Sequence, residues 1–212
     1  MTSEANGPTR SDRRRARTRA ALVAAAQELL AEGRQAAPIQ EVTERADVGI
    51  GTFYNHFATR DELFDAALED GLARWGDLLD ALGDLADPAE QFARSWRLTG
   101  RMHRLEPQLS KVLLTRGHEL SRSADGIGPR ARRDLQAAQD AGRLDRRDLD
   151  RTMVLVTGAM IELGWLLHDD PDRDAAQMTD AVAADVLVAL GMGRTEAERL
   201  SGLPLPDGLE LP

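Results

Sequence analysis

The sequence contains no cysteine, and this absence excludes disulfide bonds, cysteine nucleophiles and thiolate metal ligands together. Aromatic residues make up only 4% of the chain, so a buried core must consist mostly of leucine, alanine and valine, of which leucine and alanine favour helices. Runs of β-branched residues with a period of two are also missing, and no strand is expected. These absences together predict an all-α fold.

A long apolar run is the next missing feature. The longest, residues 153–167, is too short for a comfortable membrane span and contains Glu162. The N-terminus is polar and rich in arginine rather than apolar, so no secretory signal is expected. With 42% hydrophobic residues in 212, the chain can still bury a substantial core. We therefore predict a soluble, cytoplasmic protein that has no membrane partner.

Charge is unevenly distributed along the chain. The net charge is −9, yet residues 1–60 hold nine arginines and seven acidic residues, a net of +2, which leaves −11 for residues 61–212. Six of those arginines lie between Arg10 and Arg19, with Asp12 as the single acid among them. A basic end on an acidic body suggests a nucleic-acid-binding region joined to a region with another task. The arginines can equally form a solvated tail, or an arm that contacts phosphates or enters a minor groove.

Three helices are expected in the first sixty residues. Apolar residues recur at helical spacing over residues 22–30, in a helix that begins between Ser11 and Thr18 and stops at Gly33. Pro38 suits the first position of the second helix. A turn at residues 47–49 leads into the third helix, because Asp47 tolerates a left-handed conformation better than most residues.

Helical patterns continue to the end of the chain. Thr59 and Glu62 form a capping box that starts a long helix, and Asp87 caps another before Pro88. Further helices are expected over residues 107–120, 129–141, 148–168 and 173–190, with a loop at 121–128. The predicted organisation is a disordered tail (1–10), a helix-turn-helix domain (11–60), a ligand-binding and dimerisation domain (61–202) and an extended tail (203–212).

Residues 39–57 are the most informative segment. They indicate a short helix, a tight turn and a second short helix that has small and polar side chains on one side and aromatic ones on the other. This is typical of a helix that enters the DNA major groove. The candidates for phosphate contacts are Thr18, Arg19, Thr52, Tyr54, His56 and Arg60. The candidates for contacts with base edges are Gln40, Ile50, Gly51 and Asn55.

The run from Thr18 to Leu63 resembles the N-terminal DNA-binding domain of the TetR family of transcriptional regulators. The residues that carry the resemblance are Thr18, Arg19, Leu22, Ala25, Ala26, Leu29, Leu30, Gly33, Val42, Ala46, Val48, Gly51, Thr52, Tyr54, Phe57 and Leu63. The chain departs from the family pattern at Arg34, Ala37, Asp47 and Gly49. The resemblance implies a homodimer that binds a double-stranded operator with an inverted repeat and is released by a small-molecule inducer of unknown identity.

Residues 148–168 are apolar on nearly every side, which is typical of a helix that is buried on more than one face. Two helices from each of two chains can form a four-helix interface, and in the family that the chain resembles the last helices dimerise. The predicted interface residues are Val154, Gly158, Ile161, Trp165, Ala184 and Leu187. The alternative is that both helices belong to the core of one chain.

The resemblance also implies an inducer site among the central helices. The candidate lining residues are Trp75, Trp96, Met102, His103, Leu113, Met160, Glu162 and Trp165. Each can equally be an ordinary core residue. Glu162 is singled out because burial of an unpaired carboxylate is costly, so we expect it to meet an arginine, the dimer partner or a ligand cation.

Two other functions remain open. A DNA-binding architectural protein without a ligand would share the same N-terminal residues. A small helical metal-dependent hydrolase is suggested only by the dipeptide of His168 and Asp169, which equally suits the end of a helix, where histidine meets the negative end of the dipole. We expect no catalytic residue, no metal and no cofactor. The favoured interpretation is a ligand-responsive transcriptional repressor.

Overall fold

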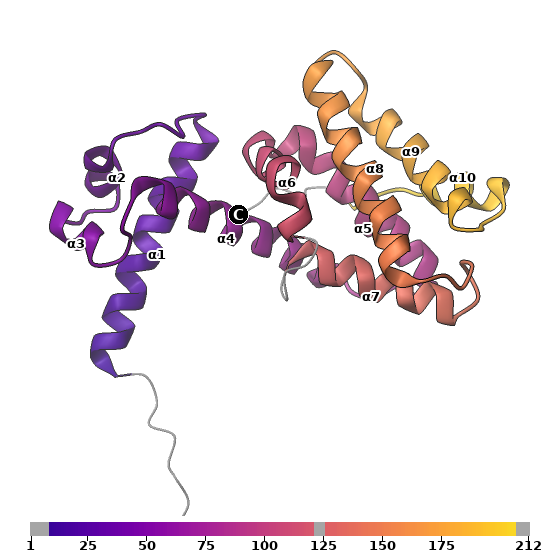
Figure 1. The fold of residues 1–212 in the computed structure, drawn as a ribbon, viewed down its shortest axis with the longest axis horizontal. Coiled ribbons are helices and arrows are strands. Elements are labelled where there is room, and N and C mark those ends of the chain that lie inside the picture. The colour runs from indigo at the N-terminus through magenta and orange to yellow at the C-terminus, as the bar shows by residue number, and fades with distance from the viewer. Residues whose placement is uncertain (1–8, 121–125, 207–212) are drawn as a thin grey trace, which may run out of the picture. The chain divides into compact units, whose positions relative to one another are not determined.

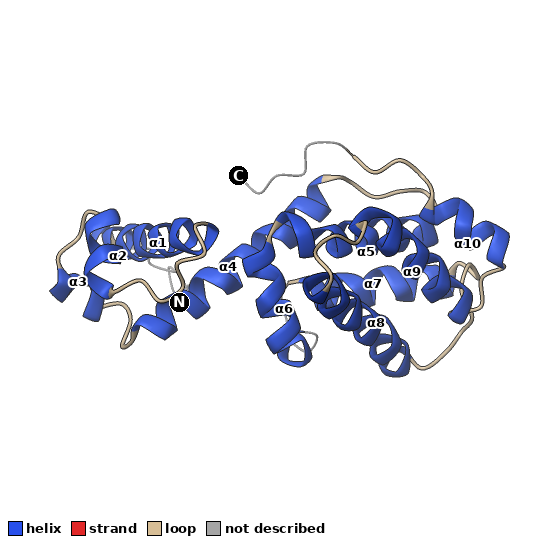
Figure 2. Ribbon diagram, turned by 90° about the horizontal axis from the view of Figure 1, so that it is seen from above, coloured by secondary structure: helices blue, strands red, loops and turns tan. Residues whose placement is uncertain are grey.

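The structure is a computed structural model that describes residues 9–120 and 126–206, without the side chains of residues 108, 112 and 116–120. All regular secondary structure in this part of the chain is helical, which confirms the predicted all-α fold class (Figures 1 and 2). Its helices are α1 (Arg10–Ala31), α2 (Ile39–Arg45), α3 (Ile50–Tyr54), α4 (Arg60–Ala81), α5 (Pro88–Leu105), α6 (Pro107–Leu120), α7 (Ile127–Asp140), α8 (Leu149–Asp169), α9 (Ala175–Ala189) and α10 (Arg194–Ser201). The predicted tails and the loop at 121–128 lie largely outside the described residues.

The chain divides into an N-terminal unit, Met1–Gly71, and a C-terminal unit, Leu72–Pro212. The division falls inside α4, whereas the sequence analysis placed it at residue 60. The reason is that Leu63, Phe64 and Ala67, in the first half of α4, pack in the core of the N-terminal unit. One helix therefore belongs to both units.

The core of the N-terminal unit is apolar. Leu22, Leu29, Val42 and Phe53 are fully buried in it, and Phe57 is nearly so. The predicted turn before α3 is present, with Asp47 at a φ of 53°, in the left-handed region. This core fixes the orientation of α2 and α3, because the short helices have few other interactions to hold them.

The helix starts show how local sequence sets the boundaries. The Thr59 side chain accepts a hydrogen bond from the Glu62 backbone nitrogen at 3.1 Å, as predicted, but the Glu62 carboxylate returns to the Ala58 nitrogen at 2.6 Å. At α1 a capping box of Thr9 and Asp12, which the sequence analysis did not identify, starts the helix at Arg10. The arginine-rich stretch is therefore helical from Arg10 onward.

α5 is central in the C-terminal unit and contacts α6, α7, α8, α9 and α10. Three arginines spaced along α5 bind residues of α9 and of the C-terminal end of α8. Arg97 and Arg101 both pair with Asp180 of α9, at 2.7 Å and 2.8 Å, and Arg104 donates to the Asp170 carbonyl at 2.7 Å. α8 and α9, which lie side by side, are thereby held on α5 (Figure 1). The sequence analysis did not predict α10, a short helix that follows a break at residues 191–193.

Among the described residues, no helix combines the length and the apolar character that crossing a membrane requires.

Candidate DNA-binding and ligand-binding sites

The outer face of α3 carries side chains that its own fold does not use. Phe53 and Phe57 point inward, whereas 52% of Ile50 and 58% of Tyr54 remain exposed. A Cβ at Gly51 would meet no atom within 4 Å, so the backbone is open to close approach there. Asn55, at the end of α3, is exposed. Ile50, Gly51 and Asn55 are thus accessible for base contacts, as is Gln40, which meanwhile donates to Glu44 at 2.9 Å.

The predicted phosphate-binding residues surround α3 but differ in how free they are. Tyr54 and Arg19 are exposed, and Thr52 is half-buried. Thr18 donates its hydroxyl to the Arg14 carbonyl at 3.2 Å within α1. Arg60 donates to the adjacent Asp61 at 2.8 Å, so a phosphate would have to compete with this carboxylate.

Two arginines of α1 lie against the C-terminal end of α3, the predicted recognition helix. Arg19 stands over the Phe57 ring, with its guanidinium carbon 5.0 Å from the ring centre. Arg15 donates to the Asn55 carbonyl at 3.4 Å. Burial, together with the charges of Arg15 and Arg19, lowers the pKa of His56, so this side chain is neutral at pH 7. The positive potential at this surface therefore comes from arginine.

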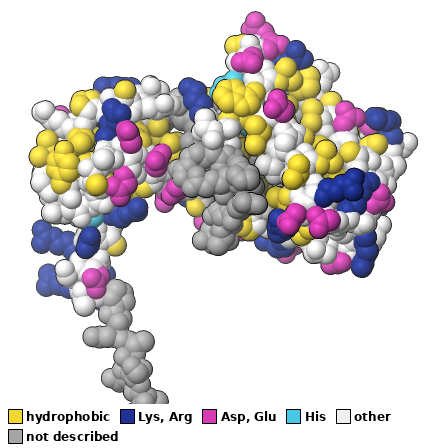
Figure 3. All heavy atoms as spheres, viewed as in Figure 1, with side chains coloured by type: hydrophobic (Ala, Val, Ile, Leu, Met, Phe, Trp, Pro, Cys, Tyr) yellow, Lys and Arg dark blue, Asp and Glu magenta, His cyan; other side chains and the backbone are white. Residues whose placement is uncertain are grey.

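α8 presents an apolar face to solvent. Val154 is 74% exposed and Trp165 43%, and Leu155 and Leu166 are exposed as well. Gly158 lies on the same face with nothing within 4 Å of a Cβ, so another backbone could come close. Yellow side chains gather in Figure 3 where Figure 1 draws α8. Exposed apolar patches of this kind mark sites of interaction.

Two predicted positions need correction. Ala184 and Leu187 are 6% and 0% exposed, because α9 turns this side toward the interior of its own unit, and so neither can face a second chain. The exposed positions of α9 include Ala181 and Asp185 instead. Glu162 is exposed on the outer face of α8, a position that keeps contact with a second chain among the expectations for its carboxylate.

Most of the predicted inducer-lining residues are packed in the core of the C-terminal unit. Trp75 and Met102 are fully buried, and Trp96, Leu113 and Met160 are nearly so. The Trp96 indole donates to the Val156 carbonyl at 3.4 Å, which satisfies its only donor. Trp165 lies on the exposed face of α8, apart from this group. The structure thus supports an ordinary core role for most of them.

His103 belongs to a buried hydrogen-bonded chain. Its Nε2 is 3.2 Å from the Met160 carbonyl, which can only accept, so Nε2 carries a proton. Burial lowers the pKa of His103 to about 4, which leaves its Nδ1 unprotonated at pH 7. The Ser110 hydroxyl, 2.7 Å away, therefore donates to Nδ1 and accepts from His168 Nε2 at 2.9 Å. Both nitrogens of His103 are used within the fold.

A second polar group, which the sequence analysis missed, joins α4 to α7. Arg130 pairs with Asp80 at 2.7 Å and with Asp77 at 2.8 Å, and Arg133 pairs with Asp134 at 3.2 Å and Asp80 at 3.3 Å. We call Asp77, Asp80, Arg130, Arg133 and Asp134 the arginine–aspartate cluster. The signal in the sequence was Asp134, which stands one turn before Ala138 and beside Leu135 on the buried side of α7.

The two carboxylates in the middle of this cluster differ in their environment. Burial raises the pKa of Asp134, which is only 5% exposed. Burial would also raise the pKa of Asp80, but the hydrogen bonds and charges of Arg130 and Arg133 outweigh it and lower the pKa. The cluster therefore combines three kinds of group. Asp80 is an ionised acceptor, Asp134 is a carboxyl that is protonated more readily, and Arg130 and Arg133 are guanidinium donors.

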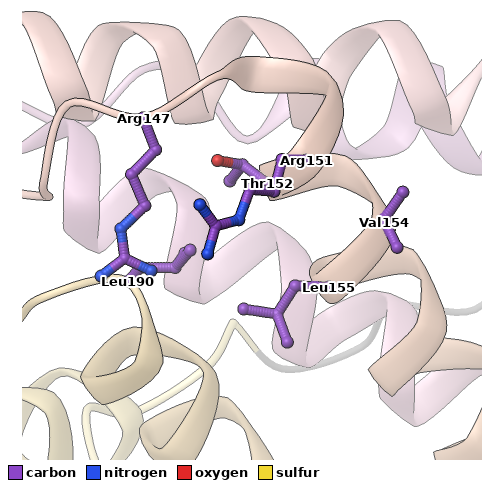
Figure 4. A pocket seen from close by; sticks show the side chains of 6 residues that line it. All are labelled: Arg147, Arg151, Thr152, Val154, Leu155 and Leu190. Carbon is purple, nitrogen blue, oxygen red and sulfur yellow. The ribbon is translucent and has the colours of Figure 1, made fainter.

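The start of α8 borders a pocket of about 290 Å³. Its lining combines apolar side chains with two arginines: Arg147, Arg151, Thr152, Val154, Leu155 and Leu190. In Figure 4 the Arg147 and Arg151 side chains lie next to each other and Leu155 lies to one side of them. Because Val154 and Leu155 also belong to the exposed face of α8, the pocket is continuous with that surface.

His168 is in the last turn of α8 and hydrogen-bonds to Ser110, so it has a place in the fold without a metal. In the part of the chain that the structure describes, no three histidine, aspartate or glutamate side chains are grouped as metal ligands would be.

Two sequence families match the chain. Residues 21–67 match the family described as "Bacterial regulatory proteins, tetR family", and residues 87–202 match "Tetracyclin repressor-like, C-terminal domain". No curated protein matches the sequence. The N-terminal match spans α2 and α3, and the C-terminal match begins just before α5.

Solved structures resemble most of the chain. The crystal structure of RolR in complex with the ligand resorcinol is 36% identical, covers 92% of this chain and 98% of its own, and has a TM-score of 0.75. RolR without ligand is 34% identical, covers 89% and 98%, and has a TM-score of 0.74. FadR from Bacillus subtilis in complex with stearoyl-CoA is 13% identical, covers 81% and 97%, and shares the fold with a TM-score of 0.59.

Proposed function

The chain belongs to the tetR family of bacterial regulatory proteins and is a ligand-responsive, DNA-binding transcription regulator of the repressor type, and from this premise we propose which residues perform each task. The observation that carries the proposal is the exposure of Ile50 and Tyr54 on a short helix whose Phe53 is completely buried. An apolar anchor fixes the helix, and its outer face is left for DNA. A protein that acts on bacterial DNA works in the cytoplasm.

DNA recognition is divided between two groups of side chains. Tyr54, Thr52 and Arg60 donate hydrogen bonds to phosphate oxygens and so position the unit without reading sequence. Asn55 and Gln40 present amide groups that can pair with adenine, and Ile50 can contact a thymine methyl group. Gly51 allows the backbone to approach the groove, since a side chain is missing there.

The operator-bound form is a homodimer that uses the exposed face of α8. Val154, Gly158 and Trp165 lie on that face together with Ile161, which is half-buried. On α9 the contact involves Ala181 and its exposed neighbours rather than Ala184 and Leu187. A symmetric pair of recognition helices reads an inverted repeat with half-sites about 34–36 Å apart.

The inducer is a small hydroxylated aromatic compound. RolR, which aligns over nearly the whole chain, binds resorcinol, a benzene ring with two hydroxyl groups. Each hydroxyl both donates and accepts, so it matches a site that has carboxylate acceptors and guanidinium donors side by side. Asp80, Arg133 and Asp134 of the arginine–aspartate cluster offer this combination.

Trp75, which lies in α4 two residues before Asp77, also carries a polar atom. Its indole nitrogen is buried and has no hydrogen-bond acceptor among the described residues, which is uncommon for a buried tryptophan. The next residue, Gly76, is covered by the Arg130 guanidinium. A ligand oxygen that reached this part of α4 would supply the missing acceptor.

Release from DNA follows from the position of α4. Its first half packs in the N-terminal unit, and its second half carries Asp77 and Asp80 of the cluster. A ligand that replaces Arg130 as the partner of these carboxylates changes the preferred position of α4. It shifts the population toward a form that no longer fits two successive grooves, provided that it binds this form more tightly.

The test uses the purified full-length chain. Selection from a pool of random duplexes should enrich an inverted repeat, and fluorescence anisotropy should then show release of that duplex when resorcinol is added. Arg133→Gln should weaken the response to resorcinol and leave operator affinity in its absence unchanged, because Arg133 lies in the C-terminal unit. Arg132→Gln is the matched control, since Arg132 is one residue away but pairs outward with Asp150 at 2.7 Å.

Failure to enrich any duplex over random competitor would overturn the DNA assignment. Operator binding that resorcinol and related phenols leave unchanged would overturn the inducer assignment only. Equal responses of Arg133→Gln and Arg132→Gln would place the ligand outside the arginine–aspartate cluster.

A further inference from the structure

The first two turns of α1 are exposed and strongly basic. All residues from Arg10 to Arg17 are exposed, and the first buried residue of the helix is Leu22. Five of these eight residues are arginines. Figure 3 shows dark blue side chains along the part of α1 where Figure 1 draws its N-terminal turns. This segment therefore contributes no apolar surface to the core, although it is held in a regular helix.

The capping box explains why the segment is helical. The Thr9 hydroxyl accepts from the Asp12 nitrogen at 3.2 Å, and the Asp12 carboxylate accepts from the Thr9 nitrogen at 2.9 Å. Asp12 is the only acid between Arg10 and Arg19, and these bonds occupy it. The guanidinium groups of Arg10, Arg14 and Arg17 form no hydrogen bond or ion pair with any described residue.

The charge pattern opposes the stability of the helix. The N-terminal end of a helix carries a partial positive charge, so cations in its first turns are unfavourable. Arg10 and Arg14, and likewise Arg13 and Arg17, are also four residues apart, a spacing at which like charges repel. A polyanion that bound along this segment would neutralise the arginines and relieve their mutual repulsion.

The segment starts beside the recognition helix. Arg15 donates to the carbonyl of Asn55, the residue that follows α3, and Arg19 covers Phe57. With a rise of about 1.5 Å per residue, Arg10 lies roughly 8 Å farther along α1 than Arg15. The other arginines are therefore within about two helical turns of Arg15, on the side of α1 that faces away from its buried residues. They lie outside the matched family segment, residues 21–67.

We propose that Arg10, Arg13, Arg14 and Arg17 form a second DNA-binding site, which contacts the phosphodiester backbone next to the base pairs read by α3. The proposal rests on the proposed DNA-binding function. Guanidinium groups suit phosphate oxygens, and Arg10, Arg13, Arg14 and Arg17 share one face of α1 because they are three, four and seven residues apart. The site adds affinity and salt dependence without altering which sequence is preferred.

The test measures the operator affinity of the full chain at several salt concentrations. Replacing Arg14 and Arg17 together by glutamine should reduce the slope of log affinity against log salt by about 0.9 for each arginine that neutralises a phosphate. The same variant should keep the operator preference of the wild type. The double variant Arg132→Gln with Arg146→Gln removes the same charge from a half-buried and an exposed position of the C-terminal unit, and its slope should stay at the wild-type value.

A second variant distinguishes loss of charge from loss of helical structure. Arg14→Lys with Arg17→Lys keeps the charge and should retain most of the salt slope, while circular dichroism checks the helix content of both variants. A wild-type slope in the glutamine variant would overturn the proposal and leave the DNA-binding function standing. A changed operator preference would show that these arginines read bases, which also overturns it. If the wild type itself prefers no duplex, the proposed DNA-binding function fails instead.

Discussion

The two units of this protein bury different kinds of side chain. In the described part of the N-terminal unit Thr43 is the single buried polar residue, whereas ten are buried in the C-terminal unit, among them Arg97, His103 and Asp134. Apolar contacts are not directional and favour one close-packed arrangement. Buried hydrogen bonds are directional, and a ligand that carries donors or acceptors can replace one of the two protein groups in such a bond. The contrast suggests a rigid DNA-binding unit joined to a unit whose interior can respond.

The largest expected effect comes from disrupting the interface between the C-terminal units of the two protomers. Val154→Asp puts a charge on the exposed face of α8, so the dimer should dissociate and operator affinity should fall by roughly 10²–10⁴-fold as avidity disappears. Analytical ultracentrifugation and anisotropy measure the two effects. Leu105→Asp is the control, because Leu105 is also exposed but lies on α5. A dimeric Val154→Asp protein would contradict the proposed interface.

The second prediction concerns the polar interior alone. His103 has a pKa of about 4 in the fold, below its ordinary 6.5, so the unfolded chain binds more protons between these values. The contribution is present above pH 6.5 and is lost as the pH falls toward 4, by roughly 3 kcal/mol at most. Urea unfolding monitored by tryptophan fluorescence reports on this unit, which holds all three tryptophans. His103→Gln should flatten the dependence on pH, and an unchanged slope would contradict the assigned proton positions.

A third prediction separates positioning from reading within the N-terminal unit. Asn55→Ala should cost about 1–3 kcal/mol at operators that carry the contacted base and little at others, which alters the sequence preference. Tyr54→Phe removes one phosphate hydrogen bond and should weaken all operators alike, by about 1 kcal/mol. Arg60→Ala should also act uniformly. Binding to a panel of operator variants measures these effects, and a uniform loss for Asn55→Ala would reassign it to the backbone.

The smallest expected effect concerns a helix start. Thr59→Ala removes the acceptor of the Glu62 nitrogen and should destabilise the N-terminal unit by about 1 kcal/mol. Hydrogen exchange of residues 22–57 measures this loss. The transition seen by tryptophan fluorescence, which reports on the C-terminal unit, should stay the same. If both units lost stability together, they would unfold as one, and the contrast between them would not extend to stability.

The N-terminal unit was largely predictable because its signals are local. The cap at Thr59, the left-handed Asp47 and the stop at Gly33 each depend on a few neighbouring residues. The apolar positions of α1 follow one helical period. In the C-terminal unit the same kinds of signal located α5 to α9, but they could not place the polar residues that face one another across helices.

Sequence alone determined where most helices begin and end and which segment presents a recognition surface, because caps, turns and periodicity act over one or two helical turns. Only the tertiary structure decided that Glu162 faces outward, that Ala184 and Leu187 face inward, and that Arg130 meets Asp80 from fifty positions away. The physical reason is that an apolar pattern predicts that one face of a helix is buried but does not specify which neighbouring helix covers it. That choice belongs to the packing of the whole unit.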